Sequence, residues 1–388
     1  MDKKLILLTG GHLTPALAII PELQKNGFEV HFAGRVNAME GDTALSEEYK
    51  EITKLKIPFH KISTGRIQRT LTSHSLSSLF KIPLGIIQAE KLITNLKPDC
   101  ILSFGGYMAV PISISAKIHG IPIVTHEQTV TLGLANRLIS KLANLNLVSH
   151  EESLKDFPKE KTILVGNPIR KEVFDNIKDL LPKEFADKIG KYPLIYITGG
   201  NQGSHAINNA VKKILPEILE KYLIINQTGS GKNSEDFKFL SELKMALPES
   251  LKEKYLLYPY ISSELIGTVL GNADLIISRS GANTISEITA LKKVAILIPL
   301  PNSGGGEQLK NAQKLVEKGV AVILNQADLE DKLLTNIEET IKSLSTYKLK
   351  YNKISLTYNL KTSLEIVVII ERLLNVQKKD LKRTKGSY

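Results

Sequence analysis

Strand-length apolar runs alternate with helix-length amphipathic segments over almost the whole chain, and no other feature constrains the fold as strongly. In the first half, the runs predicted to be strands are Lys4–Thr9, Glu29–Ala33, Cys100–Phe104, Pro122–Thr125, Asn144–Val148 and Lys161–Val165. In the second half they are Pro193–Thr198, Tyr222–Asn226, Tyr255–Tyr258, Asp274–Ile277, Ala295–Pro299 and Val320–Leu324. Strands that alternate with helices are typical of βαβ units, in which helices cover both faces of a parallel sheet. The pattern therefore predicts an α/β fold with two doubly wound domains.

The boundary between these domains is expected near Gly166-Asn167-Pro168, a turn-forming tripeptide. The N-terminal domain would then span 1–165 and the C-terminal domain 166–359. A last amphipathic segment, at about 360–376, has no strand to follow it and is expected to pack back on the N-terminal domain as a helix. The basic tail, 377–388, is expected to be disordered.

Composition narrows the classes of protein that this chain can represent. Its 388 residues include 51 Lys and Arg against 40 Asp and Glu, a formal net charge of +11. The excess favours phosphates or an anionic membrane as partners, or else surface lysines simply keep the protein soluble. Because there is no Trp and no zinc-site or recognition-helix pattern, we expect no nucleic acid partner. No apolar stretch reaches the ~18 residues of a membrane span. The single cysteine, Cys100, cannot form an intrachain disulfide, which fits a reducing cytoplasm.

The start of the chain, MDKKLILLTGG, is read as a first strand and not as a signal peptide, because its apolar run is short and ends in a glycine turn. Ligands of open parallel sheets bind beyond the carboxyl ends of the strands. The turn Thr9-Gly10-Gly11-His12 stands at such a point, and the helix after it is expected to begin with Thr14 as N-cap and Pro15 in the first helical position. A helix N-terminus attracts an anion, and a neutral imidazole there can accept a proton. His12 is therefore a candidate base, unless it only caps the turn.

Two further segments end predicted strands in the same half of the chain. Ser103-Phe104-Gly105-Gly106-Tyr107 follows one strand, and the polar triplet His126-Glu127-Gln128 follows the apolar run Ile121–Val124. Polar residues directly after an apolar run are poor core material, so we expect them to line a ligand site. The alternative is a hydrogen-bonded turn.

Glycine-rich turns recur in the second half. Thr198–Ser204 mirrors the first turn, and its mechanism is that of a phosphate cradle, with Ser204 or Asn201 as helix cap. It matches neither the G-x-G-x-x-G nor the Walker pattern. Glu287 is expected in the first turn of the helix after Ser278–Ser286, where it either stabilises the helix dipole or binds ribose hydroxyls. Gln308 and Asn311 share one face of a later helix.

Taken together, seven short motifs resemble one known family. They are GGH-x-x-PALA at 10–18, FGGY at 104–107, HEQ followed by GLANR at 126–137, GNP-x-R at 166–170, GG-x-QG at 199–203, RSGA-x-T-x-SE at 279–287 and EQ-x-x-NA at 307–312. In this order they are similar to the MurG family of bacterial cell-wall glycosyltransferases. The resemblance implies a GT-B architecture, with two Rossmann-like domains facing a cleft. It also implies a lipid-linked acceptor in the N-terminal domain and UDP-N-acetylglucosamine in the C-terminal domain.

The resemblance assigns residues to each substrate. Those implied for the donor are Arg170, Gly200, Asn201, Gln202, Gly203, Ser204, Ile261, Ser280, Gly281, Ala282, Glu287, Gln308 and Asn311. Those implied for the acceptor are Thr9, Gly10, Gly11, His12, Tyr107, His126, Glu127, Gln128 and Thr129. Glu287 would bind the ribose hydroxyls, and the 199–203 turn would contact the donor diphosphate. His12 would be the base, with Glu127 in reserve.

The chain departs from the family pattern at three places. In the first loop, usually GG-x-GGH, either Leu7-Leu8 replaces two glycines or about four residues are missing. Thr129 replaces the Asn of HEQN, and Glu307 stands where Gln is usual. An Asp-x-Asp triplet, the usual diphosphate-metal ligand of the other major class of glycosyltransferases, is absent from the sequence. We therefore expect no metal and no cofactor.

A lipid-linked acceptor also implies a peripheral enzyme at the cytoplasmic face of the cell membrane. The segment expected to meet the anionic membrane surface mixes cationic and apolar side chains: Arg66, Arg69, Leu76, Leu79, Phe80 and Lys81. An ordinary core helix with a solvated face is the alternative. The activity implied is inverting transfer of GlcNAc to undecaprenyl-diphospho-muramoyl-pentapeptide. Rival activities are another glycolipid glycosyltransferase, a UDP-GlcNAc 2-epimerase of the same fold, or a non-enzymatic nucleotide-sugar binder.

Overall fold

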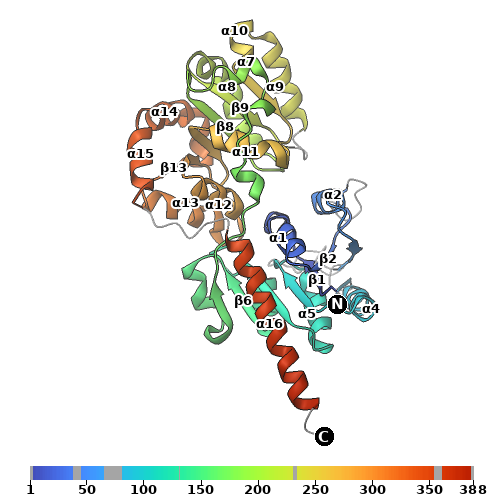
Figure 1. Cartoon of the computed structure of the whole chain (residues 1–388). Coiled ribbons are helices and arrows are strands. Elements are labelled where there is room, and N and C mark those ends of the chain that lie inside the picture. Colours follow the sequence, from blue (N-terminus) through green and yellow to red (C-terminus); the bar gives the residue numbers. More distant parts are fainter. Residues whose placement is uncertain are drawn as a thin grey trace. The chain divides into compact units, whose positions relative to one another are not determined.

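The computed structural model describes residues 3–37, 45–64, 81–130, 132–229, 234–353 and 361–385. The chain forms two compact units (Figure 1): Met1–Arg170 with Asn359–Tyr388, and Lys171–Tyr358. The first unit thus includes Gly166, which the sequence placed in the second domain. The physical reason is backbone hydrogen bonding, because the amides of Val165 and Gly166 both donate to the Val148 carbonyl, at 3.0 and 3.3 Å.

A seven-stranded sheet forms the centre of the first unit, in the order β3-β2-β1-β4-β5-β6-β7. All its pairings are parallel. The strands are β1 (Leu5–Thr9), β2 (Glu29–Gly34), β3 (Phe59–Lys61), β4 (Cys100–Ser103), β5 (Ile123–Glu127), β6 (Leu145–Val148) and β7 (Thr162–Leu164). Parallel strands covered on both faces must be apolar on both faces, which is why they stand out in the sequence as continuous apolar runs.

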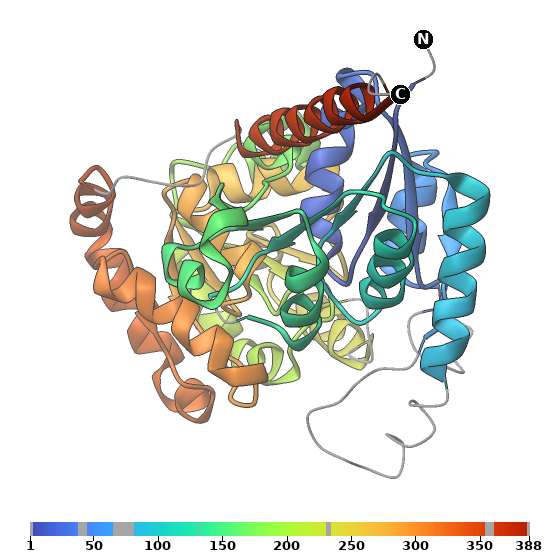
Figure 2. The same ribbon diagram turned by 90° about the horizontal axis from the view of Figure 1, so that it is seen from below.

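Helices cover the two faces of this sheet. They are α1 (Leu13–Lys25), α2 (Glu47–Lys54), α4 (Lys81–Leu96), α5 (Ala109–Ile118), α6 (Leu134–Leu142) and α16 (Lys361–Lys385), with 3-10 helices η1 (Glu151–Asp156) and η2 (Lys159–Lys161). Figure 2 shows α16 lying across α1. Ile366, Val367 and Ile370 of α16 are fully buried in the same core as Ile6 and Ile19. The last helix is therefore part of the first unit, as the sequence predicted.

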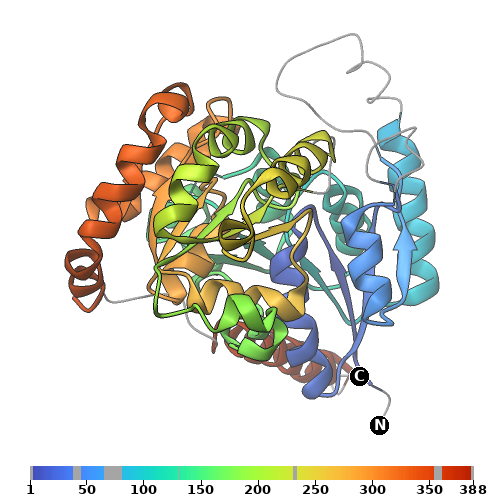
Figure 3. The same cartoon turned by 90° about the horizontal axis from the view of Figure 1, so that it is seen from above.

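A six-stranded parallel sheet forms the second unit, in the order β10-β9-β8-β11-β12-β13. Its strands are β8 (Leu194–Thr198), β9 (Leu223–Gln227), β10 (Tyr255–Tyr258), β11 (Leu275–Ser278), β12 (Val294–Leu297) and β13 (Ala321–Ile323). The helices are α7 (Lys183–Ala186), α8 (His205–Lys221), α9 (Ser234–Ala246), α10 (Glu249–Lys252), α11 (Ser263–Asn272), α12 (Ala282–Ala290), α13 (Glu307–Glu317), α14 (Leu329–Lys342) and α15 (Leu344–Tyr351). The 3-10 helices are η3 (Lys171–Phe174), η4 (Lys178–Leu180), η5 (Gly304–Gly306) and η6 (Gln326–Asp328). Figure 3 shows α14 and α15, in orange, on one flank of this unit.

All the strands predicted from the sequence are present, each shifted by at most a residue or two at its ends. The prediction of two doubly wound, Rossmann-like domains is confirmed. One strand was missed, β3, because three residues with the polar pair His60 and Lys61 form no apolar run. Among the described residues, no helix is long and apolar enough to cross a membrane.

Three predicted helix starts and ends differ from the structure. Helix α1 begins at Leu13, so His12 is the N-cap residue and Thr14 already lies inside the helix. Helix α12 begins at Ala282, which places Glu287 beyond the first turn. Helix α16 continues to Lys385, through most of the tail that was expected to be disordered. No Gly or Pro occurs between Lys361 and Lys385, so no residue of the tail breaks the helix before Gly386.

Candidate active site

Both sheets reverse their strand order at one point, and this point locates the candidate site in each unit. In the first unit, the order runs outward from β1 on one side and from β4 on the other; in the second, the same holds for β8 and β11. Ligands of doubly wound sheets bind beyond the carboxyl ends of the strands at such a switch point. The sequence-predicted glycine turns follow β1, β4 and β8, so the fold places them at the expected edges.

In the first unit, the turns after β1 and β4 pack backbone against backbone. The Gly11 amide donates to the Gly105 carbonyl at 3.0 Å, and the Phe104 amide donates to the Thr9 carbonyl at 2.8 Å. Gly106 has φ +80°, and a Cβ there would lie 2.8 Å from the Gly11 nitrogen. Gly106 is required because its positive φ suits glycine and no Cβ fits between the two turns at this position.

Glu127 is a buried carboxylate whose two oxygens are occupied by neutral donors. Oε1 accepts hydrogen bonds from the Thr129 amide at 3.1 Å and from its hydroxyl at 2.9 Å. Oε2 accepts from Asn136 Nδ2 at 2.9 Å and from the Gly133 amide at 3.3 Å. Through these four hydrogen bonds, Glu127 holds the loop after β5 in place.

His126 and Glu127 are the last residues of β5 itself, two residues beyond the predicted strand end. His126 is fully buried, and burial lowers its pKa to about 4. The neutral ring donates from Nε2 to the Gly166 carbonyl at 2.9 Å. His126 thus anchors the turn that leads out of the first unit.

Gln128 follows directly and is also buried, 1% exposed. Neither its Oε1 nor its Nε2 has a hydrogen-bond partner among the described residues. Buried amides are normally paired, so an unsatisfied one is a feature typical of a ligand site.

His12 differs from His126 because its residue is exposed to solvent and its ring makes no capping hydrogen bond. Even so, desolvation by the surrounding protein lowers the pKa of His12, and the Glu127 carboxylate opposes this shift. The ring is therefore neutral near pH 7 and able to accept a proton. Tyr107, half-buried, lies in the turn after β4, with the Arg35 guanidinium 6.0 Å from its ring centre.

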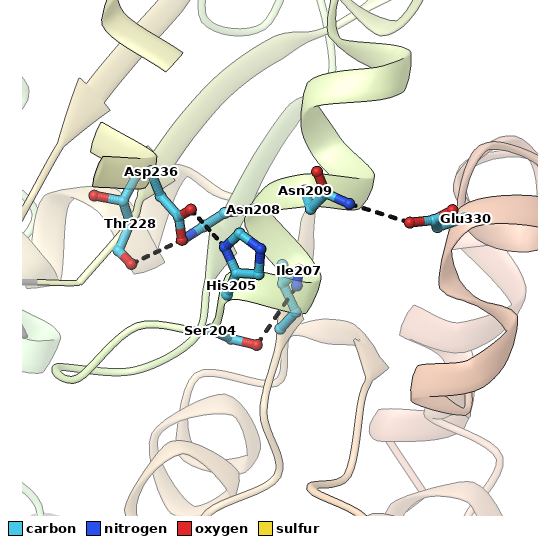
Figure 4. A network of polar contacts seen from close by, with 8 residues as sticks. All are labelled: Ser204, His205, Ile207, Asn208, Asn209, Thr228, Asp236 and Glu330. Carbon is cyan, nitrogen blue, oxygen red and sulfur yellow. Dashed lines mark hydrogen bonds and ion pairs between the residues drawn. The ribbon is translucent and has the colours of Figure 1, made fainter. Parts of the chain in front are cut away.

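In the second unit, the turn after β8 wraps tightly around the start of α8. Ser204 is the N-cap, and its Oγ accepts a hydrogen bond from the Ile207 amide at 3.5 Å (Figure 4). A Cβ on Gly199 would lie 2.2 Å from the Ser204 nitrogen, and one on Gly229 would lie 2.3 Å from Gly203 Cα. The first N–H groups of α8 and its positive dipole end are thus framed by glycine backbone, an arrangement suited to a phosphate.

A network of polar contacts joins α8 to the segment after β9 and to α9. Asn208 Nδ2 donates to the Thr228 carbonyl at 3.0 Å and to Asp236 Oδ2 at 2.9 Å, and His205 Nδ1 lies 2.7 Å from Asp236 Oδ1 (Figure 4). One position further along the helix, Asn209 Nδ2 donates to Glu330 Oε1 of α14 at 3.1 Å.

Gln227, at the end of β9, connects three segments of the second site. Its Nε2 donates to the Gly200 carbonyl at 3.1 Å, and its Oε1 accepts from the Ile261 amide at 3.2 Å and from the Tyr196 hydroxyl at 3.3 Å. The Ile261 side chain is buried, 4% exposed, and its amide is occupied by Gln227. This bond fixes the β10–α11 loop relative to the glycine turn.

Arg279 follows β11 directly and bonds segments that follow strands on either side of it. Its Nη2 donates to Ser204 Oγ at 2.7 Å and to Gln326 Oε1 at 2.6 Å. Its Nη1 donates to the carbonyls of Ile298 and Pro299, at 3.1 and 3.4 Å. Desolvation lowers the pKa of this guanidinium, which nevertheless stays protonated in proteins.

The predicted residues Ser280, Gln308 and Asn311 form one cluster. Ser280 Oγ donates to the Gln308 carbonyl at 2.8 Å, and Asn311 Nδ2 donates to the Ser280 carbonyl at 3.2 Å. Gln308 Oε1 accepts from the Leu300 amide at 3.0 Å. Glu287 is half-buried on α12, whose N-cap is Gly281.

The remaining predicted residues fall elsewhere. Arg170 belongs to the first unit, at its very end. The membrane residues Arg66, Arg69, Leu76, Leu79 and Phe80 lie outside the described residues, and so does the side chain of Lys81. No group of three or more His, Cys, Asp or Glu within the described residues is placed to hold a metal ion.

Comparison with known proteins matches both units to one family. The N-terminal domain model of glycosyltransferase family 28 matches residues 9–147, and the C-terminal domain model of the same family matches 194–363. A UDP-N-acetylglucosamine–N-acetylmuramyl-(pentapeptide) pyrophosphoryl-undecaprenol N-acetylglucosamine transferase of Clostridium perfringens is 36% identical over 356 residues, 90% of this chain and 93% of that protein. The chain belongs to the MurG family, within glycosyltransferase family 28.

A second relative and two solved structures are also similar to this chain. The transferase of the same name from Lachnoclostridium phytofermentans is 37% identical over 339 residues, 85% of this chain and 88% of that protein. The crystal structure of Acinetobacter baumannii MurG has a TM-score of 0.65 at 24% identity, covering 95% of this chain and 99% of that chain. A UDP-GlcNAc 2-epimerase from Neisseria meningitidis has a TM-score of 0.64 at 18% identity, covering 96% and 100%. These two structures show the shared fold.

Sequence reasoning missed three residues that organise the site in this MurG-family chain: Asn136, Gln227 and Arg279. Asn136 and Arg279 stand in motifs that were noticed, GLANR and RSGA, but nothing in the sequence says which atoms they bond. Asn136 lies against Gly105, where a Cβ would come within 2.8 Å of its Nδ2, and it also bonds Thr125 at 3.1 Å.

We predict that Gly106→Ala destabilises the first unit more than Gly27→Ala. Both glycines have nearly the same positive φ, +80° and +81°, but a Cβ on Gly27 meets nothing within 4 Å. Gly27→Ala should cost only the backbone strain of about 1–2 kcal/mol, whereas Gly106→Ala adds a steric penalty of about 1–3 kcal/mol. Urea unfolding followed by circular dichroism measures the difference. Equal midpoints for the two variants would show that the turns can separate without cost.

Proposed function

We propose that this chain transfers N-acetylglucosamine from UDP-N-acetylglucosamine to the 4-hydroxyl of lipid-diphospho-N-acetylmuramoyl-pentapeptide, with inversion at the anomeric carbon. The product is the lipid-linked disaccharide precursor of peptidoglycan. The observation that carries the proposal is the 36% identity, over 90% of the chain, to the Clostridium perfringens transferase, whose name states the donor, the acceptor and the sugar transferred.

The second unit would bind the donor. A diphosphate at the turn after β8 would meet the N–H groups of α8, whose dipole stabilises the negative charge that develops on UDP as it leaves. Ser280, Gln308 and Asn311 hold the neighbouring segments together, and Glu287 would accept hydrogen bonds from the ribose hydroxyls.

The first unit would bind the acceptor. The 4-hydroxyl attacks the anomeric carbon, the bond to the UDP oxygen breaks, and the hydroxyl proton passes to a base. His12 is the proposed base because it is exposed, neutral and free of a capping bond. The Glu127 carboxylate, already saturated with hydrogen bonds, is better suited to stabilise the imidazolium by its charge than to take the proton itself.

The first test is a transfer assay with purified protein, labelled UDP-GlcNAc and a lipid-diphospho-muramoyl-pentapeptide. We expect labelled product, UDP release that depends on the acceptor, and full activity in EDTA. Metal should be dispensable because α8 offers its positive end to the diphosphate and the sequence has no Asp-x-Asp triplet. Activity that is lost in EDTA and restored by Mg²⁺ would refute the metal-independent mechanism. UDP release without acceptor would favour the epimerase.

We predict that Glu287→Ala weakens donor binding about 10- to 150-fold, because charge-assisted hydrogen bonds contribute about 1.5–3 kcal/mol. Titration calorimetry with UDP measures the change. Glu317→Ala, at an exposed glutamate of α13, serves as the control and should bind like the parent. Parental UDP affinity in a folded Glu287→Ala variant would remove Glu287 from the ribose site.

We predict that His12→Ala lowers turnover about 10²- to 10⁴-fold, the usual effect of losing a general base, and leaves the UDP dissociation constant unchanged. Because desolvation lowers the pKa of His12 from 6.5, the acidic limb of kcat/KM in the parent should lie below pH 6.5. That limb should vanish in His12→Ala. Near-parental turnover and an unchanged pH profile would transfer the role of base to another group, with Glu127 next in line.

We also propose that the enzyme works at an anionic membrane surface, since its acceptor is lipid-linked and the chain carries a net charge of +11. Reversing Arg66, Arg69 and Lys81 to Glu should reduce binding to anionic vesicles at low salt, because each cation near such a surface contributes about 1 kcal/mol. UDP binding should be unchanged. Vesicle binding equal to that of the parent would return this segment to the core-helix interpretation.

A further inference from the structure

Arg279 spans the switch point of the second sheet. Its neighbour Ser278 pairs with Thr198, the last residue of β8, so the guanidinium reaches from the end of β11 to the cap of α8. The bond from Nη2 to Ser204 Oγ, at 2.7 Å, is shorter than the capping bond that the same oxygen accepts from Ile207, at 3.5 Å. Arg279 is therefore the stronger of the two restraints on the Ser204 side chain.

The guanidinium is fixed by neutral groups alone. Its terminal nitrogens carry four N–H groups, and these face four acceptors: a hydroxyl, an amide oxygen and the carbonyls of Ile298 and Pro299. Planar donors held in this way cannot rotate or withdraw. Neutral acceptors fix the position of the charge without cancelling it.

No carboxylate compensates this charge within the described part of the chain. Desolvation is the one cause of the shift in the pKa of Arg279, with no contribution from an acidic group. Lys293 offers a contrast in the same unit. Its ammonium donates to the carbonyls of Gly271 and Ala273, and desolvation lowers its pKa, but the Asp274 carboxylate nearby opposes this shift. Lys293 precedes β12, at the opposite end of the strands from Arg279.

A partly buried cation without a counter-ion is costly unless an anion joins it. Arg279 stands beside the glycine turn and α8, whose N–H groups already favour an anion. We infer that Arg279 is a positioning residue of the donor site, which fixes the start of α8 through Ser204 and adds an uncompensated positive charge for the diphosphate. The inference rests on the proposed function, because it requires a nucleoside diphosphate at this turn.

The test compares UDP with uridine in titration calorimetry, since uridine lacks the phosphates on which the charge acts. Arg279→Gln should weaken UDP binding at least about 10-fold and leave uridine binding unchanged. Arg279→Lys keeps the positive charge but loses the planar guanidinium with its four N–H donors. It should recover part of the UDP affinity that Arg279→Gln loses. Ser204→Ala keeps the Arg279 charge but removes the hydroxyl through which Arg279 holds the start of α8. It should weaken UDP binding less than Arg279→Gln does.

Lys293→Gln is the matched control, because it removes another desolvated, carbonyl-held cation. It should lower the thermal midpoint without changing the ratio of UDP to uridine affinity. If Arg279→Gln weakens uridine as much as UDP, Arg279 only maintains the fold and the inference is overturned. If Arg279→Gln and Arg279→Lys both bind UDP like the parent, the inference is overturned as well. A parent protein that binds no UDP would instead refute the proposed function itself.

Discussion

The two switch points, where the strand order of each parallel sheet reverses, are the constraint on which the rest of this structure depends. At each of them the chain leaves a strand, turns through glycines and enters a helix whose first N–H groups have no carbonyl partner within that helix. Each turn has a glycine at which a Cβ does not fit: Gly106 faces the Gly11 backbone, and Gly199 faces Ser204. A compact turn and an open helix N-terminus are therefore produced together, once in each unit.

Each unit also holds one charged side chain by neutral hydrogen bonds, at the switch point or one strand away from it. In the first unit it is the Glu127 carboxylate, bonded by Thr129, Gly133 and Asn136. In the second it is the Arg279 guanidinium, bonded to Ser204, Gln326 and two carbonyls. Such bonds fix a charge without neutralising it. The negative charge of Glu127 raises the proton affinity of His12, which suits the proposed base. The positive charge of Arg279 would stabilise the diphosphate as UDP departs.

The motifs of the MurG family indicated where the chemistry would lie, but not which atoms would be engaged. Glu127 remains the reserve candidate for the base, and only the structure shows that its two oxygens accept four hydrogen bonds from Thr129, Gly133 and Asn136. Glu287 was expected in the first turn of its helix, where its charge would stabilise the dipole. Since α12 begins at Ala282, Glu287 lies beyond the first turn, where the effect of a charge on the helix dipole is weak. Its role in binding the ribose stays a prediction.

The sequence by itself determined the alternation of strands and helices, the two parallel sheets and the glycine turns at their edges. It could do so because strands buried on both faces must be apolar throughout, and because tight turns need glycine. It missed β3, whose three residues form no apolar run. Only the tertiary structure decided the partners of Asn136, Gln227 and Arg279, since each bonds residues outside its own helix, strand or turn. Hydrogen bonds of this kind depend on the distance and direction between atoms, and those arise only when the sheet has brought the strand ends together.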